Sequence, residues 1–243
     1  LWQFKNNCTT KRMKESLQIL LDLTQASRDL YDKIIPEESI DCNFQTNGLF
    51  MLYNTEKGYE HGLDEAQTMQ DKGLQVKTMT VHQVREIEPS VRPEIVGGVL
   101  YPGDAYLHPS NFVKGLANRL QDLGVSIREK TKVIGFETVG DTISSVKTTR
   151  GDYQSEQVVL AAGSWSPKLM KNLGIALPVQ PAKGYSVTVH KKGSPTKYPL
   201  ILDEAKVGVN PMGQMIRLAG TLEMAGMNLS ISKLRVKAIV ENA

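Results

Sequence analysis

One stretch in the second half of the chain decides which fold the sequence predicts: Val158-Val159-Leu160-Ala161-Ala162-Gly163-Ser164-Trp165-Ser166. Its first three residues form an unbroken apolar run, which is typical of a strand buried on both faces. The small residues that follow allow another group to approach the backbone. Ser164 can cap a helix that has Pro167 in its first turn. A buried strand, a small-residue turn and a helix start together indicate a nucleotide-binding edge of an open α/β sheet.

The composition excludes several classes of protein. The chain has 243 residues, enough for one large or two small domains, and a net charge of only +3 without a dense basic stripe, which argues against nucleic-acid binding. Cys8 and Cys42 favour a reduced compartment, and no CxxC or HxxxH pair predicts a metal site. No apolar run reaches the roughly 18 residues of a membrane span, and no signal peptide opens the chain. We therefore expect a cytoplasmic protein without a metal.

Periodicity and capping residues predict the regular elements. Apolar residues at helical spacing, bounded by caps, Gly or Pro, predict helices at 10–35, 57–71, 81–86, 109–123, 165–171 and 232–240. Short β-branched runs between turn residues predict strands at 41–44, 48–53, 95–101, 125–128, 133–138, 143–149, 153–160, 184–191, 199–203, 207–210 and 215–221. The strands at 125–128 and 158–160 are expected to be parallel neighbours. Because the chain lacks an initial Met and stops inside a predicted helix, we expect an internal piece of a longer protein.

Three further motifs carry a resemblance to a known family. They are the loop Gly103-Asp104-Ala105-Tyr106-Leu107-His108-Pro109, the segment Gln180-Pro181-Ala182-Lys183-Gly184-Tyr185-Ser186 and the segment Arg217-Leu218-Ala219-Gly220-Thr221-Leu222-Glu223. In order and spacing, together with the 158–166 stretch, they resemble the FAD-dependent D-amino acid oxidase superfamily, most nearly its D-amino acid dehydrogenase and glycine oxidase branch. Two family features are missing, namely the GxGxxG strand-turn-helix and a glycine-rich segment near the C-terminus. FAD is therefore expected in the full-length protein and absent or weakly bound in this chain.

The resemblance implies a fold of the α+β or α/β class. A mixed, mainly antiparallel substrate-domain sheet with helices is expected, plus a partial, Rossmann-like FAD-binding domain without its GxGxxG strand. Residues 1–106, with the long first helix, and 175–243 are expected to form the substrate domain, and 107–174 the partial FAD domain. The strands at 41–53, 95–101 and 184–221 should share one sheet whose inner face looks toward the flavin.

The same resemblance implies cofactor-binding residues. Those expected against the FAD are Ala161, Ala162, Gly163, Ser164 and Trp165. Val133 is expected to offer its backbone N–H and C=O to the adenine edge, a role compatible with an apolar side chain. The plain alternatives are tight strand-to-helix packing and an ordinary strand valine.

Candidate substrate residues are Tyr185, Arg217 and Tyr53. A guanidinium suits a substrate carboxylate, and Arg217 alternates with apolar neighbours and so points away from them. The plain alternatives are an exposed strand arginine and half-buried packing tyrosines. His108, directly before Pro109, is expected to cap a helix and not to act in catalysis.

In the family that this chain resembles, a C–N bond of an amino acid is oxidised by hydride transfer to flavin N5, and the cofactor supplies the hard chemistry. A dedicated base is then not required, and no catalytic residue is assigned. The expected partner is a small amino acid; a quinone acceptor and peripheral contact with the inner face of a membrane also remain open, as does the oligomeric state. The alternatives are another oxidoreductase of the superfamily, acting on sarcosine or glycerol-3-phosphate, and a non-catalytic α/β binding module.

Overall fold

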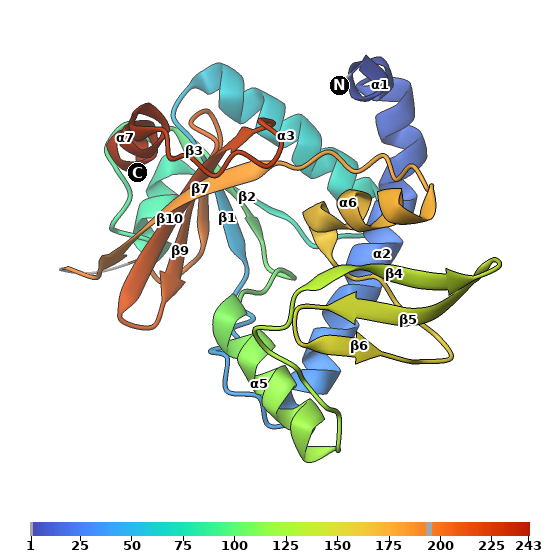
Figure 1. The fold of residues 1–243 in the computed structure, drawn as a ribbon. Coiled ribbons are helices and arrows are strands. Elements are labelled where there is room, and N and C mark those ends of the chain that lie inside the picture. The colour runs from blue at the N-terminus through green and yellow to red at the C-terminus, as the bar shows by residue number, and fades with distance from the viewer. Residues whose placement is uncertain (1, 193–195) are drawn as a thin grey trace.

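The computed structural model describes residues 2–192 and 196–243. The helices are α1 Trp2–Asn7, α2 Thr10–Glu37, α3 Glu56–Asp71, α4 Val81–Ile87, α5 Pro109–Asp122, α6 Ser166–Met170 and α7 Lys233–Asn242, with short 3₁₀ turns η1 Gly163–Trp165 and η2 Lys171–Leu173. The strands are β1 Leu49–Tyr53, β2 Lys77–Thr80, β3 Gly97–Tyr101, β4 Val133–Val139, β5 Thr142–Thr148, β6 Gly151–Tyr153, β7 Lys183–His190, β8 Leu200–Leu202, β9 Val207–Met212 and β10 Met215–Glu223. Figure 1 shows how these elements are arranged.

A seven-stranded sheet in the order β2-β3-β1-β8-β9-β10-β7 forms the larger part of the molecule (Figure 1). Its β1–β8 pair is parallel and its other pairs are antiparallel. Strands from both ends of the chain therefore share one sheet, which confirms the predicted mixed sheet. The first segment of the chain and the last meet at the parallel pair, where Leu52 lies beside Leu202.

Helices cover the two faces of this sheet differently. Successive strand residues point to opposite faces, so Leu52 and Tyr53 mark the two sides. Tyr53 packs in a cluster with Ala66 of α3, whereas Leu52 packs with Val84 of α4. Ile239 of α7 joins the Leu52 side through apolar residues of β8 to β10. The core is thus divided between an α3 face and an α4–α7 face.

Local capping explains why the helices begin where they do. The side chains of Thr9, Thr55 and Thr80 each accept a backbone N–H in the first turn of the following helix, and Thr80 forms a reciprocal capping box with Gln83. His108 Nδ1 accepts from the N–H of Asn111 at 3.3 Å, which confirms its predicted capping role at α5. Helix α2 runs one residue past Pro36, which lies in its final turn.

The second part of the molecule is smaller. Strands β4, β5 and β6 form a three-stranded antiparallel sheet, in which β4 and β5 match the strands predicted at 133–138 and 143–149, whereas β6 already ends at Tyr153. Residues 125–128 are not a strand. Residues 41–44 are not a strand either. They lie beside the start of α5, where the carbonyl of Cys42 accepts from His108 N at 2.7 Å.

The stretch at 158–166 differs most from its prediction. Residues 158–160 are not a strand, and Val159 is 90% exposed. A strand buried on both faces needs neighbours on both sides to satisfy its N–H and C=O groups, and among the described strands none lies beside these residues. Ser164 lies inside η1 and does not cap a helix; α6 begins two residues later, with Pro167 in its first turn as predicted.

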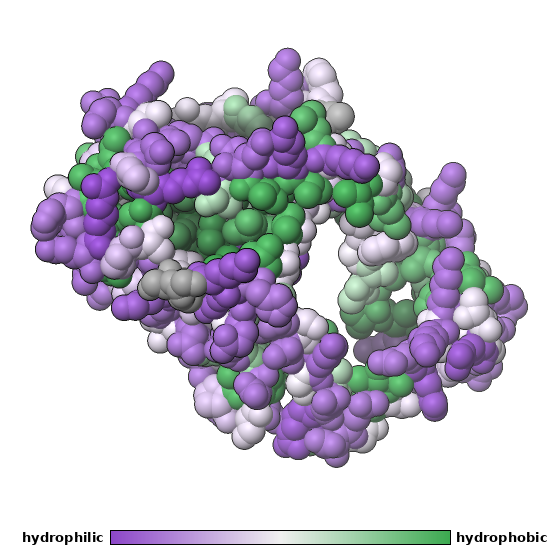
Figure 2. All heavy atoms as spheres, turned by 90° about the vertical axis from the view of Figure 1, so that its left-hand side faces the viewer, coloured by the Kyte–Doolittle hydropathy of each residue, from purple (hydrophilic) through white to green (hydrophobic). Residues whose placement is uncertain are grey.

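Apolar side chains remain at the surface in several places. In the space-filling view, hydrophobic atoms line a hollow and an opening among hydrophilic ones (Figure 2). Exposed large hydrophobic residues occur on α2, near the 158–166 stretch and before α7; they include Ile19, Leu23, Val159, Trp165 and Leu229. Contiguous exposed apolar surface of this kind marks an interaction site for a ligand or for further protein.

Candidate functional site

A cavity of about 890 Å³ lies between the three-stranded sheet and the 158–172 segment. It brings together residues that are far apart in the sequence: Lys132, Val133, Ile134, Phe136, Val146, Val158, Val159, Leu160, Ala161, Ala162, Trp165, Lys168, Leu169 and Asn172. The amide of Asn172 donates to the carbonyl of Ile134 at 3.4 Å and ties η2 to β4. Four of the six predicted cofactor residues, Val133 among them, line this one cavity.

Gly163 and Ser164, the other two predicted cofactor residues, are not among the lining residues. Gly163 instead makes the turn into η1: its φ of 50° lies in the left-handed region that favours glycine. Their contact with a cofactor stays a prediction.

The walls of the cavity suit a large, flat ligand with a charged part. Most lining side chains are apolar, and Trp165 is 59% exposed beside Ala161 and Ala162, whose small side chains leave the backbone approachable. Lys132 and Lys168 add two ammonium groups, which act as point charges toward phosphate. The residues therefore fit a cofactor that combines aromatic rings with phosphates.

A second candidate surface lies on the seven-stranded sheet, on the face opposite α7. Arg217 of β10 is directly across from Asn210 of β9 and Thr188 of β7, and cross-strand partners point to the same side. Arg217 is partly exposed, and within residues 2–192 and 196–243 its side chain has no hydrogen-bond or ion-pair partner. This row can offer a free guanidinium, flanked by an amide and a hydroxyl, to a carboxylate.

Tyr185 does not lie on that surface. Its cross-strand partner is Gly220, so it shares the face of Leu218 and α7 and points away from Arg217. Only 7% of Tyr185 is exposed, and its hydroxyl donates to the carboxylate of Glu223. The register of β7 against β10 therefore separates Tyr185 from Arg217, and a contact of Tyr185 with substrate stays a prediction.

Tyr53 shares the face of Arg217 but lies beneath α3. It is 2% exposed, its ring packs against Gly62, and it contacts the ring of Tyr59 with centroids 5.9 Å apart. Burial, and then the nearby carboxylate of Asp203, raise the pKa of its hydroxyl. Tyr53 is thus packed in the core beneath α3, and its contact with substrate stays a prediction.

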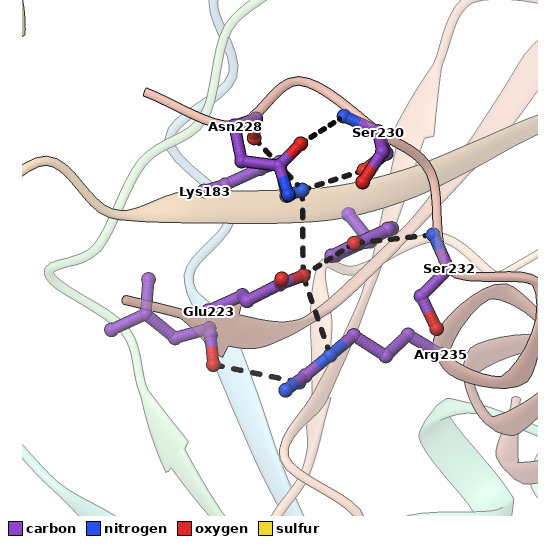
Figure 3. Close-up of polar contacts among 8 residues, drawn as sticks. Lys183, Glu223, Asn228, Ser230, Ser232 and Arg235 are labelled. Atoms are coloured by element: carbon purple, nitrogen blue, oxygen red, sulfur yellow. Dashed lines mark hydrogen bonds and ion pairs between the residues drawn. The ribbon is translucent and has the colours of Figure 1, made fainter. Parts of the chain in front are cut away.

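Sequence reasoning missed a polar cluster around Glu223, which Figure 3 shows. Its carboxylate accepts from Tyr185 and lies 3.4 Å from Nζ of Lys183 and 3.5 Å from Nε of Arg235. The hydrogen bond from Tyr185, followed by the charge of Lys183, lowers the pKa of Glu223. Lys183 and Glu223 are paired across β7 and β10, but each lies just outside its predicted strand, at 184–191 and 215–221, so the sequence did not predict that they meet.

Comparison with known proteins identifies the family. Residues 6–243 match the family model described as "FAD dependent oxidoreductase" (DAO). The chain belongs to the DAO family. The chain is 30% identical over 239 residues to a D-amino acid dehydrogenase of Granulibacter bethesdensis, covering 96% of this chain and 57% of that protein. It is 32% identical over 247 residues to the corresponding protein of Paramagnetospirillum magneticum, covering 99% and 58%.

Solved structures of the DAO family agree. Glycine oxidase from Bacillus cereus superposes with a TM-score of 0.82 at 25% identity, covering 91% of this chain and 62% of that one. L-proline dehydrogenase from P. horikoshii shares the fold, with a TM-score of 0.77 at 20% identity over 90% and 60% of the two chains. The predicted resemblance is confirmed, and the chain spans a little over half the length of the two dehydrogenase relatives.

Two negative findings complete the description of this DAO chain. In the part of the chain that the structure describes, no helix is both long and apolar enough to cross a membrane. Within the same residues, no three His, Cys, Asp or Glu side chains are placed to hold a metal ion.

Proposed function

We propose that this chain supplies part of the FAD surface and the substrate sheet of an enzyme that oxidises the C–N bond of an amino acid, as a D-amino acid dehydrogenase does. The observation that carries the proposal is the shared cavity of Val133, Ala161, Ala162 and Trp165. These residues were predicted to meet the cofactor from the resemblance, and they come together from separate elements. The names of the two dehydrogenase relatives support the substrate class.

The residues of the cavity would hold FAD in three ways. Ala161 and Ala162 let the cofactor approach the backbone, Trp165 excludes water from an aromatic ring, and Lys132 and Lys168 neutralise phosphate charge. When bound, FAD supplies the group that accepts a hydride. The chain itself then has to bind and orient the cofactor and the substrate, which is consistent with the absence of an assigned catalytic base.

Arg217 is the group that we assign to the substrate carboxylate. Its guanidinium is unpaired among the described residues, and Asn210 and Thr188 on either side can hydrogen-bond a second polar group of the substrate. A carboxylate fixed at this row would orient the rest of the amino acid relative to the sheet.

The test of the reaction uses the full-length protein that contains this chain. A panel of D-amino acids, with sarcosine and glycerol-3-phosphate included, is assayed with oxygen and with a dye acceptor. We expect turnover of D-amino acids, with KM raised about 10- to 100-fold in Arg217→Met, since a charged hydrogen bond contributes about 1.5–3 kcal/mol. Arg128→Met, at an exposed position, is the matched control. Turnover of glycerol-3-phosphate alone, or of nothing, would reject the proposal.

The cofactor surface has a test that does not depend on turnover. Ala161→Leu places a larger side chain in the cavity, and we expect weaker flavin retention, measured as flavin absorbance per protein after dialysis. Ala26→Leu, at an exposed position on α2 outside the cavity, is the control and should retain flavin like the parent protein. Equal flavin content in both variants would contradict the assignment of the cavity.

A further inference from the structure

The Glu223 cluster does more than join two strands. Besides its ion pair, Nζ of Lys183 donates to the carbonyls of Asn228 at 3.0 Å and Ser230 at 2.6 Å (Figure 3). The N–H of Ser232 donates to the hydroxyl of Tyr185 at 3.3 Å. Three contacts of one cluster therefore reach the segment 224–232, which we call the strap.

The strap has little else to hold it. Residues 224–232 form neither helix nor strand. Its large apolar side chains point outward, since Leu229 is 77% exposed, Ile231 75% and Met227 45%. Without a buried apolar anchor or a ladder of backbone hydrogen bonds, the position of the strap depends on the polar contacts of Lys183 and Tyr185.

The cluster also lies where the two parts of the molecule are joined. Lys183 is the first residue of β7. Residues 175–182 directly before it form no helix or strand and connect η2, beside the candidate cofactor cavity, to the seven-stranded sheet. Arg235 belongs to α7 and also donates to the carbonyl of Leu222 at 3.5 Å. The carboxylate of Glu223 is thus linked to three places: the start of β7, where the 175–182 connection ends, the end of β10, and the start of α7.

Backbone strain is found next to the same carboxylate. The pairing of β10 with β7 shifts register between Gly220 and Leu222, and Thr221 between them has a φ of 56°. A β-branched residue rarely adopts this left-handed conformation, and its hydroxyl is buried without a partner among the described residues. A strained backbone of this kind persists only where surrounding contacts hold it in place. Glu223, two residues after Thr221, makes such contacts.

We propose that Glu223 is a positioning residue that, through Lys183 and Arg235, fixes the strap and the 175–182 connection, and thereby holds the Arg217 row in place relative to the cofactor cavity. The claim about substrate rests on the proposed function; the claim about the strap does not. Glu223 itself touches neither candidate surface, because it lies on the side of Tyr185 and α7.

The first test is hydrogen exchange of this chain, which needs no turnover. In Glu223→Gln we expect amide exchange in 223–232 and 183–186 to rise about tenfold, the change that corresponds to losing roughly one charged hydrogen bond. Glu156→Gln, an exposed site outside the cluster, should leave exchange unchanged, and protection of β1 and β3 reports that the variants are folded. Unchanged exchange of the strap in Glu223→Gln overturns the proposal.

A second pair of variants covers the case in which Glu223→Gln does not fold. Lys183→Gln removes the contacts to the strap but leaves the carboxylate, whereas Lys183→Arg keeps the charge and the donors. We expect amide exchange in the strap to be fast in Lys183→Gln and to return to the parent rate in Lys183→Arg. Fast exchange in both, or in neither, overturns the proposed role of the charge.

The full-length enzyme separates positioning from mere local stability. We expect Glu223→Gln to raise the KM for the amino acid about fivefold with a smaller change in kcat, because binding geometry and not chemistry is disturbed. A loosened strap with unchanged KM rejects the positioning role. If the parent enzyme oxidises no amino acid, the proposed function fails while the exchange result still decides the role of the strap.

Discussion

Replacing Gly97 with Ala is expected to destabilise the protein through one identifiable contact. Gly97 of β3 lies under the ring of Tyr59 of α3, and a Cβ added there would come within 2.6 Å of Cζ and 2.7 Å of both Cε atoms. The ring has little freedom to retreat, because its hydroxyl donates to the carbonyl of Met79 at 3.0 Å. Gly97→Ala must therefore push α3 away from the sheet or break that hydrogen bond.

The magnitude follows from three terms. Overpacking costs about 1–3 kcal/mol and loss of the Tyr59 hydrogen bond about 1 kcal/mol. Restricting the unfolded chain by replacing Gly offsets about 0.4–1 kcal/mol. The net loss is about 2 kcal/mol, which for a chain of this size lowers Tm by about 4–8 °C.

Thermal and urea unfolding followed by circular dichroism measure this loss. Gly103→Ala is the matched control, since no atom lies within 4 Å of its added Cβ, and we expect a change within about 0.5 kcal/mol. Tyr59→Leu should restore part of the stability in the Gly97→Ala background. Equal midpoints for Gly97→Ala and Gly103→Ala would refute the close packing of α3 on β3.

Three further predictions concern single polar contacts; the first two are measured as urea midpoints and the third as the dependence of stability on pH. Glu88→Gln should cost about 1–3 kcal/mol, because this carboxylate is 2% exposed and both of its oxygens accept, Oε1 from the hydroxyl of Ser90 and Oε2 from Lys197 N at 2.8 Å, whereas an amide has only one oxygen that can accept. Thr80→Ala should cost about 1 kcal/mol by removing the capping box with Gln83, and a loss below about 0.3 kcal/mol would argue against that cap. The pKa of Glu223 is lowered in the folded state, so its stabilisation is present above the ordinary value of 4.5 and is lost as the pH falls through the lowered value. Glu223→Gln should remove this part of the acid dependence, and identical acid profiles would contradict it.

Several features could be predicted because their causes lie within a few residues of one another. The caps at Thr9, Thr80 and His108 each use a side chain and an N–H three positions later, so these helix starts were predicted closely. The mixed sheet followed from the resemblance to a known family. The same resemblance named Val133 and Ala161, which line one cavity, and their contact with a cofactor stays a prediction.

Other features depended on pairings between distant segments. Residues 158–160 have the composition of a buried strand, yet strand structure requires a neighbour, and the described strands provide none there. Tyr185 and Arg217 belong to strands that were both predicted, but only their register shows that they occupy opposite faces. A shift of one residue in pairing exchanges the two faces, and the sequence of one strand does not specify it.

By itself, then, the sequence of this DAO-family chain determined where most helices begin and where most of the strands lie. Only the tertiary structure decided which strands pair, which face each side chain takes and that Lys183, Glu223 and Arg235 meet at one point. The physical reason is the distance along the chain over which each interaction acts. Capping and periodicity act over a turn of chain, whereas a shared face or an ion pair depends on how elements dozens of residues apart pack together.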